Sequence, residues 1–186
     1  MMKRIALYLL LCAVCLAGLG PASAASPETD PSDWPDVPFA RRIETGEIIY
    51  LGMEKDEAEA ITGEPLGEGL FSKNKYVYEG ITLAFRDDLV VYIEIPYEEP
   101  LWAANGVVTP FMPTDQALEA LGMPFEPGND PYNIWYFEDG TQAHFDRSPP
   151  SKDTRRDYQW SLTFFADSQT AGQITMGDKQ YLTTLQ

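Results

Sequence analysis

The sequence is poor in the residues that build covalent or metal-bound frameworks. Its 186 residues include two cysteines, Cys12 and Cys15, and a single histidine, His144. Both cysteines lie in an N-terminal apolar segment that we expect to be removed, so the mature chain is predicted to contain no thiol. Disulfides, iron–sulfur clusters and cysteine-ligated zinc are then excluded, and one histidine cannot form a multi-histidine metal site. We expect no metal and no cofactor.

Positive charge is also scarce. The chain has 13 basic residues against 29 acidic ones, which gives a formal net charge of -16. Nucleic acids and anionic lipids are held largely by Lys and Arg, so neither is an expected partner. The chain is nevertheless 44% hydrophobic and 12% aromatic, which is unlike a disordered sequence. The composition predicts a folded, acidic domain with its own core.

Residues 1–24 have the organisation of a secretory signal peptide. Lys3 and Arg4 precede an apolar run, and small residues follow at Ala22 and Ala24. The run is shorter than the roughly 20 residues that span a membrane. Neither cysteine follows the small residues that a lipoprotein signal requires. We therefore expect cleavage after Ala24 and an exported protein, periplasmic or extracellular, without a stable membrane anchor.

Residues 25–43 are rich in proline, which forbids a regular helix or a central strand. We interpret this segment as a flexible arm. Its large apolar residues Trp34 and Phe39 could pin its end to the domain surface.

The two halves of the remaining chain resemble each other in sequence. An offset of 59 residues places Met53 on Met112 and the Gly63–Pro65 pair on the corresponding glycine and proline of the second half. The second half then contains one additional residue. After it, a glycine and a phenylalanine of the first half again coincide with the same residue types of the second half, in the expected strands. The sequence thus predicts a duplication, with repeat 1 at 44–95, a linker at 96–105 and repeat 2 at 106–186.

Each half has a helical segment followed by alternating apolar residues. A glycine and then a proline end each helix, and an acidic residue lies in each first turn. The fold class predicted is α+β, two tandem repeats that each contain a short helix and an antiparallel three-stranded meander. Thr114 is expected to cap the second helix. The expected helices are 54–62 and 114–121, the strands are 76–78, 81–85, 89–95, 134–137, 141–146 and 158–166, and 173–176 and 180–184 are short strand or loop.

The segments 51–58 and 61–65 carry a glycine–methionine start and a glycine–x–proline end. This pattern resembles the helix that opens BamE/SmpA-type and beta-lactamase-inhibitor-protein-like modules of bacterial envelope and secreted proteins. The resemblance covers roughly residues 46–166, and it implies a helix before an antiparallel meander, in tandem in the inhibitor proteins. The chain departs from both families, because it has neither the disulfides of the inhibitors nor the acylated cysteine of the lipoprotein.

No catalytic constellation is apparent. His144 has no recognisable nucleophile motif near it, and the adjacent carboxylates at 87–88, 98–99 and 138–139 lie at expected turns or connections. Glycines follow the first helix rather than preceding it, which is the wrong context for a phosphate-binding loop. We therefore expect no catalytic residue.

Aromatic side chains and one basic segment are the candidate binding features. Tyr and Trp supply binding energy at low entropic cost, and several lie on or beside the expected strands. Residues 147–156 reverse the acidic balance of the chain in a proline-containing loop. The candidate contact residues are Tyr97, Trp102, Tyr136, Trp160, Arg147, Lys152, Arg155 and Arg156.

These observations favour an exported, non-enzymatic protein that recognises another protein through an aromatic sheet face and loops. Two alternatives stay open: an envelope structural or assembly factor, and a hydrolase that depends on a pair of carboxylates. A solvated hairpin loop remains the alternative interpretation of the basic segment.

Overall fold

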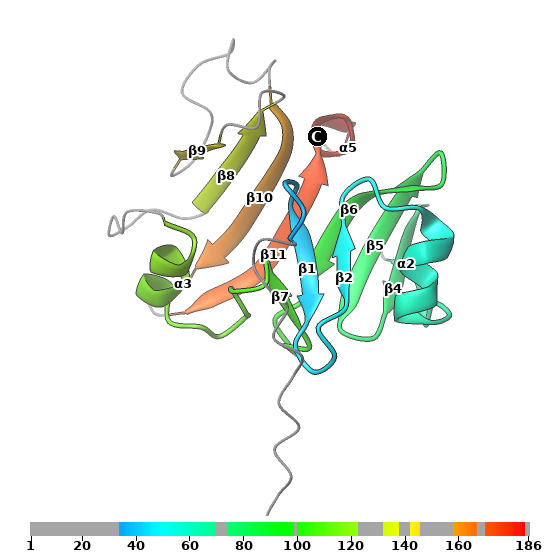
Figure 1. Cartoon of the computed structure of the whole chain (residues 1–186), viewed down its shortest axis with the longest axis horizontal. Helices are drawn as coiled ribbons and strands as arrows, with labels where there is room; N and C mark the ends of the chain where they lie inside the picture. Colours follow the sequence, from blue (N-terminus) through cyan, green and yellow to red (C-terminus); the bar gives the residue numbers. More distant parts are fainter. Residues whose placement is uncertain are drawn as a thin grey trace, which may run out of the picture.

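A computed structural model describes residues 34–69, 74–98, 100–122, 132–137, 142–145, 158–166 and 170–184. The predicted signal peptide and the basic segment 147–156 lie outside these residues. Within the described part, the fold is a mixed α+β structure with mostly strands (Figure 1).

The largest element is an eight-stranded sheet in which every neighbouring pair is antiparallel. Its strand order is β3-β4-β5-β6-β11-β10-β8-β9. β11 joins the two sides of the sheet, because it pairs with β6 on one edge and with β10 on the other. The strands are β3 (Gly67–Glu68), β4 (Lys75–Tyr78), β5 (Ile81–Arg86), β6 (Leu89–Ile95), β8 (Tyr132–Phe137), β9 (Gln142–Phe145), β10 (Tyr158–Ala166) and β11 (Ala171–Asp178).

A second, three-stranded sheet has the order β2-β1-β7, formed by Ile48–Tyr50, Phe39–Arg42 and Trp102–Ala104. Two of these strands correct the predicted boundaries. β1 lies in the predicted flexible arm 25–43, and β7 lies in the predicted linker 96–105. The reason is burial: Phe39 and Ala40 in β1, and all three residues of β7, are buried, and both strands are paired along their length.

Three helices are described: α2 (Lys55–Thr62), α3 (Thr114–Ala120) and α5 (Lys179–Thr184). The predicted helix ends are confirmed, since Gly63 and Gly122 follow α2 and α3 with φ of 79° and 67°, which glycine adopts without steric cost. The expected N-cap is wrong by one residue. Pro113 occupies that position, and Thr114 is the first, buried residue of α3.

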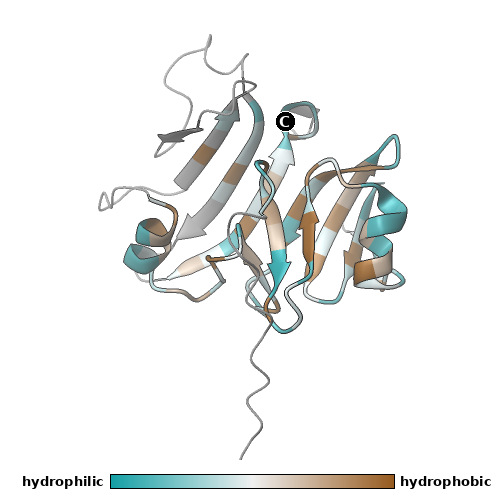
Figure 2. Ribbon diagram, viewed as in Figure 1, coloured by the Kyte–Doolittle hydropathy of each residue, from teal (hydrophilic) through white to brown (hydrophobic). Residues whose placement is uncertain are grey.

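The core lies on one face of the eight-stranded sheet. α2, α3 and the three-stranded sheet all contribute to it, through Ala58, Leu118 and Ile49, against sheet residues such as Ile93 and the other members of the cluster. A smaller cluster lies on the other face, where Tyr181 of α5 packs on Ala84, Val91 and Tyr92. Figure 2 shows the corresponding hydrophobic bands along β5, β6 and β2.

A register shift changes which residues of β6 share a face. The sequence alternation places Val91 with Ile93 and Ile95, but an irregularity in the β5–β6 pairing falls between Ala84 and Phe85. Consequently Val90 joins the main core while Val91 packs on the opposite face with Tyr92. Bulges of this kind reverse the side-chain alternation, and no simple period reports them.

The two halves differ in strand pairing. β4, β5 and β6 form the predicted meander. In the second half β8 pairs with both β9 and β10, so the predicted meander order is wrong there. Residues 173–176, expected to be a short strand or loop, belong to β11 in the middle of the sheet, and 180–184 are in α5. None of the described helices is long and apolar enough to cross a membrane.

Candidate functional site

The predicted contact aromatics differ sharply in exposure. Trp102 is 0% exposed and Tyr136 is 5% exposed, whereas Tyr97 is 53% exposed. Trp160 is partly buried and packs on the main core. Trp102 and Tyr136 are therefore too buried to contact a partner, and their prediction as contact residues is wrong. The four basic candidates, Arg147, Lys152, Arg155 and Arg156, lie outside the described residues.

Trp102 is an anchor of the three-stranded sheet. Its indole Nε1 donates a hydrogen bond to the backbone oxygen of Glu79 at 3.1 Å, and the Arg42 guanidinium lies 4.9 Å from the ring centroid. The contact with Glu79 ties β7 to the β4–β5 turn. A buried tryptophan with a satisfied N–H is well suited to this role, and the residue holds the two sheets together.

The exposed aromatic candidate is a pair rather than a single ring. Tyr97 follows β6, and Phe111 lies between β7 and α3; their ring centroids are 6.4 Å apart in an edge-to-face arrangement. Phe111 is also 53% exposed. Phe111 is not among the predicted contact residues, because a lone phenylalanine between two nearby prolines carries no periodic signal. We refer to Tyr97 and Phe111 together as the aromatic pair.

The backbone holds Phe111 in an unfavourable conformation. Its φ is 67°, in the left-handed region that bulky residues rarely adopt. The segment is nevertheless fixed: Phe111 N–H donates to the Ala171 oxygen, and Ala171 N–H donates to the Met112 oxygen, both at 2.8 Å. The aromatic pair is thus presented from a segment bonded to the start of β11.

Asn105 connects Tyr136 to the three-stranded sheet. The Phe39 N–H donates to Asn105 Oδ1 at 3.2 Å, and Asn105 Nδ2 donates to Tyr136 Oη at 2.6 Å. The Asn105 N–H also donates to the Phe39 oxygen. Asn105 has a φ of 46°, which asparagine tolerates better than most residues. One side chain therefore links β1 to β8.

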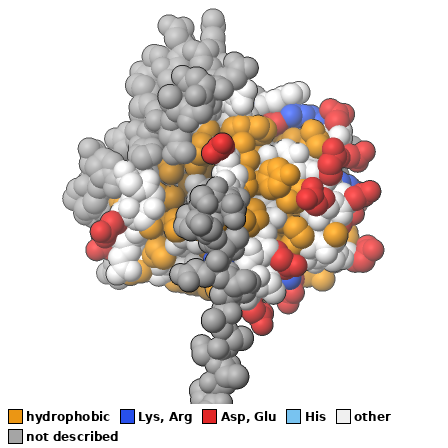
Figure 3. All heavy atoms as spheres, in the orientation of Figure 1, with side chains coloured by type: hydrophobic (Ala, Val, Ile, Leu, Met, Phe, Trp, Pro, Cys, Tyr) orange, Lys and Arg blue, Asp and Glu red, His pale blue; other side chains and the backbone are white. Residues whose placement is uncertain are grey.

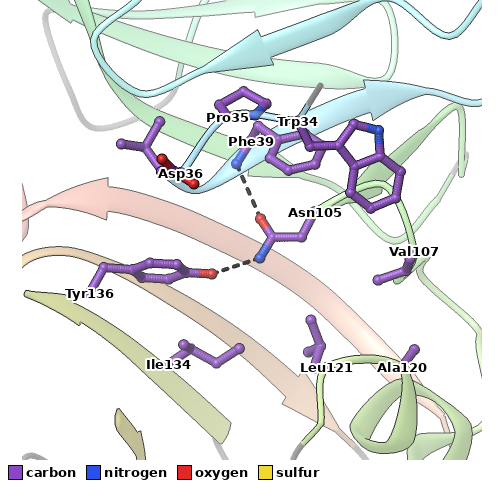
Figure 4. A pocket seen from close by; sticks show the side chains of 11 residues that line it. Trp34, Pro35, Asp36, Phe39, Asn105, Val107, Ala120, Leu121, Ile134 and Tyr136 are labelled. Atoms are coloured by element: carbon purple, nitrogen blue, oxygen red, sulfur yellow. Dashed lines mark hydrogen bonds between the residues drawn. The ribbon is translucent and has the colours of Figure 1, made fainter. Parts of the chain in front are cut away.

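A cavity of about 500 Å³ lies beside this link (Figure 4). Its walls come from the segment before β1, from the turn after β7, from the end of α3 and from β8. Most of its lining residues are apolar, but polar groups supply the larger share of the surface that faces the cavity, and Asp36, Asn105 and Tyr136 are among the residues that carry them. The other described lining residues are Trp34, Pro35, Val37, Phe39, Val107, Ala120, Leu121 and Ile134.

Burial raises the pKa of three tyrosines above the ordinary tyrosine value. For Tyr78 and Tyr92 the effect of burial is reinforced by Glu59 and Glu94, which accept hydrogen bonds from the phenols at 3.0 and 2.8 Å. For Tyr136 burial raises the pKa, and the hydrogen bond from Asn105 opposes part of that effect. All three phenols are therefore neutral at physiological pH. In this state they act as hydrogen-bonding groups and not as bases.

Acidic and hydrophobic surfaces are separated on the face shown in Figure 3. Asp and Glu side chains gather mainly on the side that carries α2, and hydrophobic side chains are visible over the centre. Among the described residues no three His, Cys, Asp or Glu side chains gather as a metal site. Asp36 is the sole carboxylate among the described residues of the cavity wall.

Comparisons with protein-family models, with curated proteins and with solved structures found no match. The resemblance to BamE/SmpA-type and inhibitor-like modules therefore stays a prediction from the sequence.

Proposed function

We propose that the protein is an exported, non-enzymatic binding protein that recognises another protein through the aromatic pair. The observation that carries this proposal is the combination, at Phe111, of a half-exposed ring and a left-handed backbone. Rings of this size that stay accessible to solvent are typical anchors of protein interfaces.

The conformational cost at Phe111 favours a role for this residue in binding and not in folding stability. A left-handed conformation costs a residue with a Cβ atom about 1 to 2 kcal/mol, and glycine would avoid that cost. The contact with Tyr97 returns about 0.5 to 1.5 kcal/mol at best. Since the pair is only half-buried, Phe111 adds little to folding stability, and burial of both rings against a partner would offset the strain.

The pair is too small to be a whole interface, because a stable complex buries about 800 Å² on each partner. It is proposed as the central anchor of a larger contact surface. The apolar body of each ring would enter a pocket on the partner, and the Tyr97 hydroxyl would reach a polar group at the rim.

Site-specific photo-crosslinking in the cell of origin tests the proposal. A benzophenone amino acid at position 111 should yield a discrete adduct with one protein. The same probe at Leu66 is the matched control, because Leu66 is 75% exposed but lies directly before the edge strand β3. The adduct from position 111 should disappear when Tyr97 is changed to Ser.

Two results would contradict the proposal. One is an absence of adducts from position 111 in cells that contain the folded protein. The other is an identical set of adducts from positions 111 and 66, which would indicate nonspecific collisions of exposed apolar residues.

We also propose that the chain is a tandem repeat, with units 44–95 and 106–186. The support is that a glycine with positive φ lies within two residues of the end of each of α2 and α3, and that each helix is followed by a hairpin, β4–β5 and β8–β9. An experimental structure in which the two helix–hairpin units superpose would support a duplication, and unrelated helix positions would argue against one.

A further inference from the structure

The cavity beside Asn105 has the properties of a small-molecule site. Its volume of about 500 Å³ falls within the range of about 300 to 1,000 Å³ that ligand pockets occupy. It is bounded by segments distant in the sequence, and it combines apolar side chains with polar groups that supply the larger share of the surface facing the cavity. Such sites derive affinity from the apolar walls and orientation from the polar groups.

The apolar walls are suited to a flat or branched hydrocarbon group. Trp34 and Phe39 lie edge to face with their centroids 5.4 Å apart, and aliphatic side chains of β8 and α3 lie across from them. Trp34 is held close to the turn after β7, since a Cβ atom added at Gly106 would lie 2.9 Å from the indole. The aromatic wall is therefore positioned by the fold.

Two oxygen acceptors on the wall can face a cation: the Asp36 carboxylate and the Tyr136 oxygen that also accepts the Asn105 amide proton. Asn105 Oδ1 already accepts from the Phe39 N–H, and the buried Trp34 indole N–H is a donor without a hydrogen-bond partner among the described residues. No Lys, Arg or His is among the described lining residues. In the view of Figure 4, Asp36 and Tyr136 lie at one end of the cavity, with Trp34, Val107 and Ala120 at the other.

From this arrangement we propose that the cavity binds a small organic cation with an apolar body, such as an aryl-alkyl ammonium compound. The ammonium group faces Asp36 and the Tyr136 oxygen, and the hydrocarbon body lies against Trp34 and the aliphatic wall. Charge complementarity favours this class, because the local carboxylate and the net charge of -16 both attract cations and repel anions. The site is separate from the aromatic pair and does not depend on the proposed protein partner.

Three probes of matched shape test the proposal by ligand-detected NMR titration of the full mature chain. They are 2-phenylethylammonium, 2-phenylethanol and phenylacetate, which differ in charge at one end of the same ring. The cation should bind with the highest affinity, in about the millimolar range for so small a molecule, and the anion with the lowest. Trp34→Ala should abolish saturable binding of all three.

The carboxylate is tested by Asp36→Asn, which should weaken binding of the cation by about twofold to fivefold, as expected for a solvent-exposed ion pair, and leave 2-phenylethanol unchanged. Asp87→Asn is the matched control. It removes the same charge from an exposed turn that does not line the cavity, and asparagine retains the left-handed conformation there.

Three outcomes overturn the proposal: no saturable binding of any probe, equal affinity for the anion and the cation, or equal weakening by the Asp36 and Asp87 substitutions. The last result would mean that net charge, and not the cavity, attracts the cation. None of these outcomes bears on crosslinking at position 111, so failure here leaves the proposed protein-binding function standing.

Discussion

Asn105 and Phe111 lie in the same stretch of chain and both have a left-handed backbone, but the fold uses them differently. The Asn105 side chain makes two hydrogen bonds that connect β1 to β8, so its conformation is compensated inside the molecule. Phe111 has a larger side chain, a less tolerable conformation and a half-exposed ring. The difference separates a conformation retained for folding from one that we attribute to binding.

The largest effect is expected for Asn105→Ala. This change removes both side-chain hydrogen bonds and places a Cβ-bearing residue in a left-handed turn, at a cost of about 2 to 4 kcal/mol in the free energy of unfolding. Denaturant unfolding of the purified protein measures it. Asn105→Gly should recover about 1 kcal/mol of the loss, since glycine relieves only the backbone. Equal stability of all three proteins would show that Asn105 does not link the sheets.

The second prediction concerns alkaline pH and the partner of Asn105. Burial raises the folded-state pKa of Tyr136 above that of the unfolded chain, so its contribution is complete below about pH 10 and is lost as the pH rises. Above about pH 10 the phenol ionises in the unfolded chain before it does in the folded protein, and this difference lowers the free energy of unfolding. Tyr136→Phe should therefore show a shallower alkaline decline in urea unfolding than the unchanged protein does. Tyr78 and Tyr92 act in the same direction.

A control keeps this pH prediction specific to Tyr136. Tyr97→Phe is the matched control, because it removes an exposed phenol and leaves all three buried phenols in place. If Tyr136→Phe follows the unchanged protein above pH 10, then Tyr136 is not kept neutral by the fold.

Phe111→Gly should leave stability within about 1 kcal/mol of the original, because relief of the backbone offsets loss of the ring contact. Partner binding should be lost at the same time, as measured by photo-crosslinking from position 97 in the Phe111→Gly chain. A clear loss of stability with binding retained would reverse our assignment and make Phe111 a structural residue like Asn105.

The smallest effect is expected at the β5–β6 turn. Asp87 and Asp88 have φ of 52° and 60°, and short polar residues accept this conformation with little cost. Asp87→Asn should change the free energy of unfolding by less than about 0.5 kcal/mol, measured by thermal denaturation. A larger change would mean that the Asp87 carboxylate has a structural role that its exposure does not indicate.

Local features of the fold were predictable from the sequence. The glycines that end α2 and α3, the acidic first turns and the β4–β5–β6 meander all follow from short-range rules, and the structure confirms them. The placement of β1, β7 and β11 was not predictable in this way. Each pairs with residues far along the chain, and pairing of that kind leaves no period in the sequence.

The candidate site was only partly predictable for the same reason. Tyr97 was identified from its residue type and its place between the expected repeats. Whether Trp102 or Tyr136 is exposed depends on partners such as Glu79 and Asn105, which only the assembled fold brings together. Phe111 was missed because its significance lies in a backbone angle, and the cavity because its walls come from four separate segments.

The position of β11 has a consequence for how the chain folds. β6 precedes β10 in the sequence, and β11 follows both. The edge of β6 and the edge of β10 that face each other therefore stay unpaired until β11 is inserted between them. Partly synthesised chains therefore carry two unpaired strand edges rich in apolar residues, which are prone to pair with other chains. Rapid docking of 171–178, or a chaperone that shields β6 and β10 until then, would set the yield of native protein.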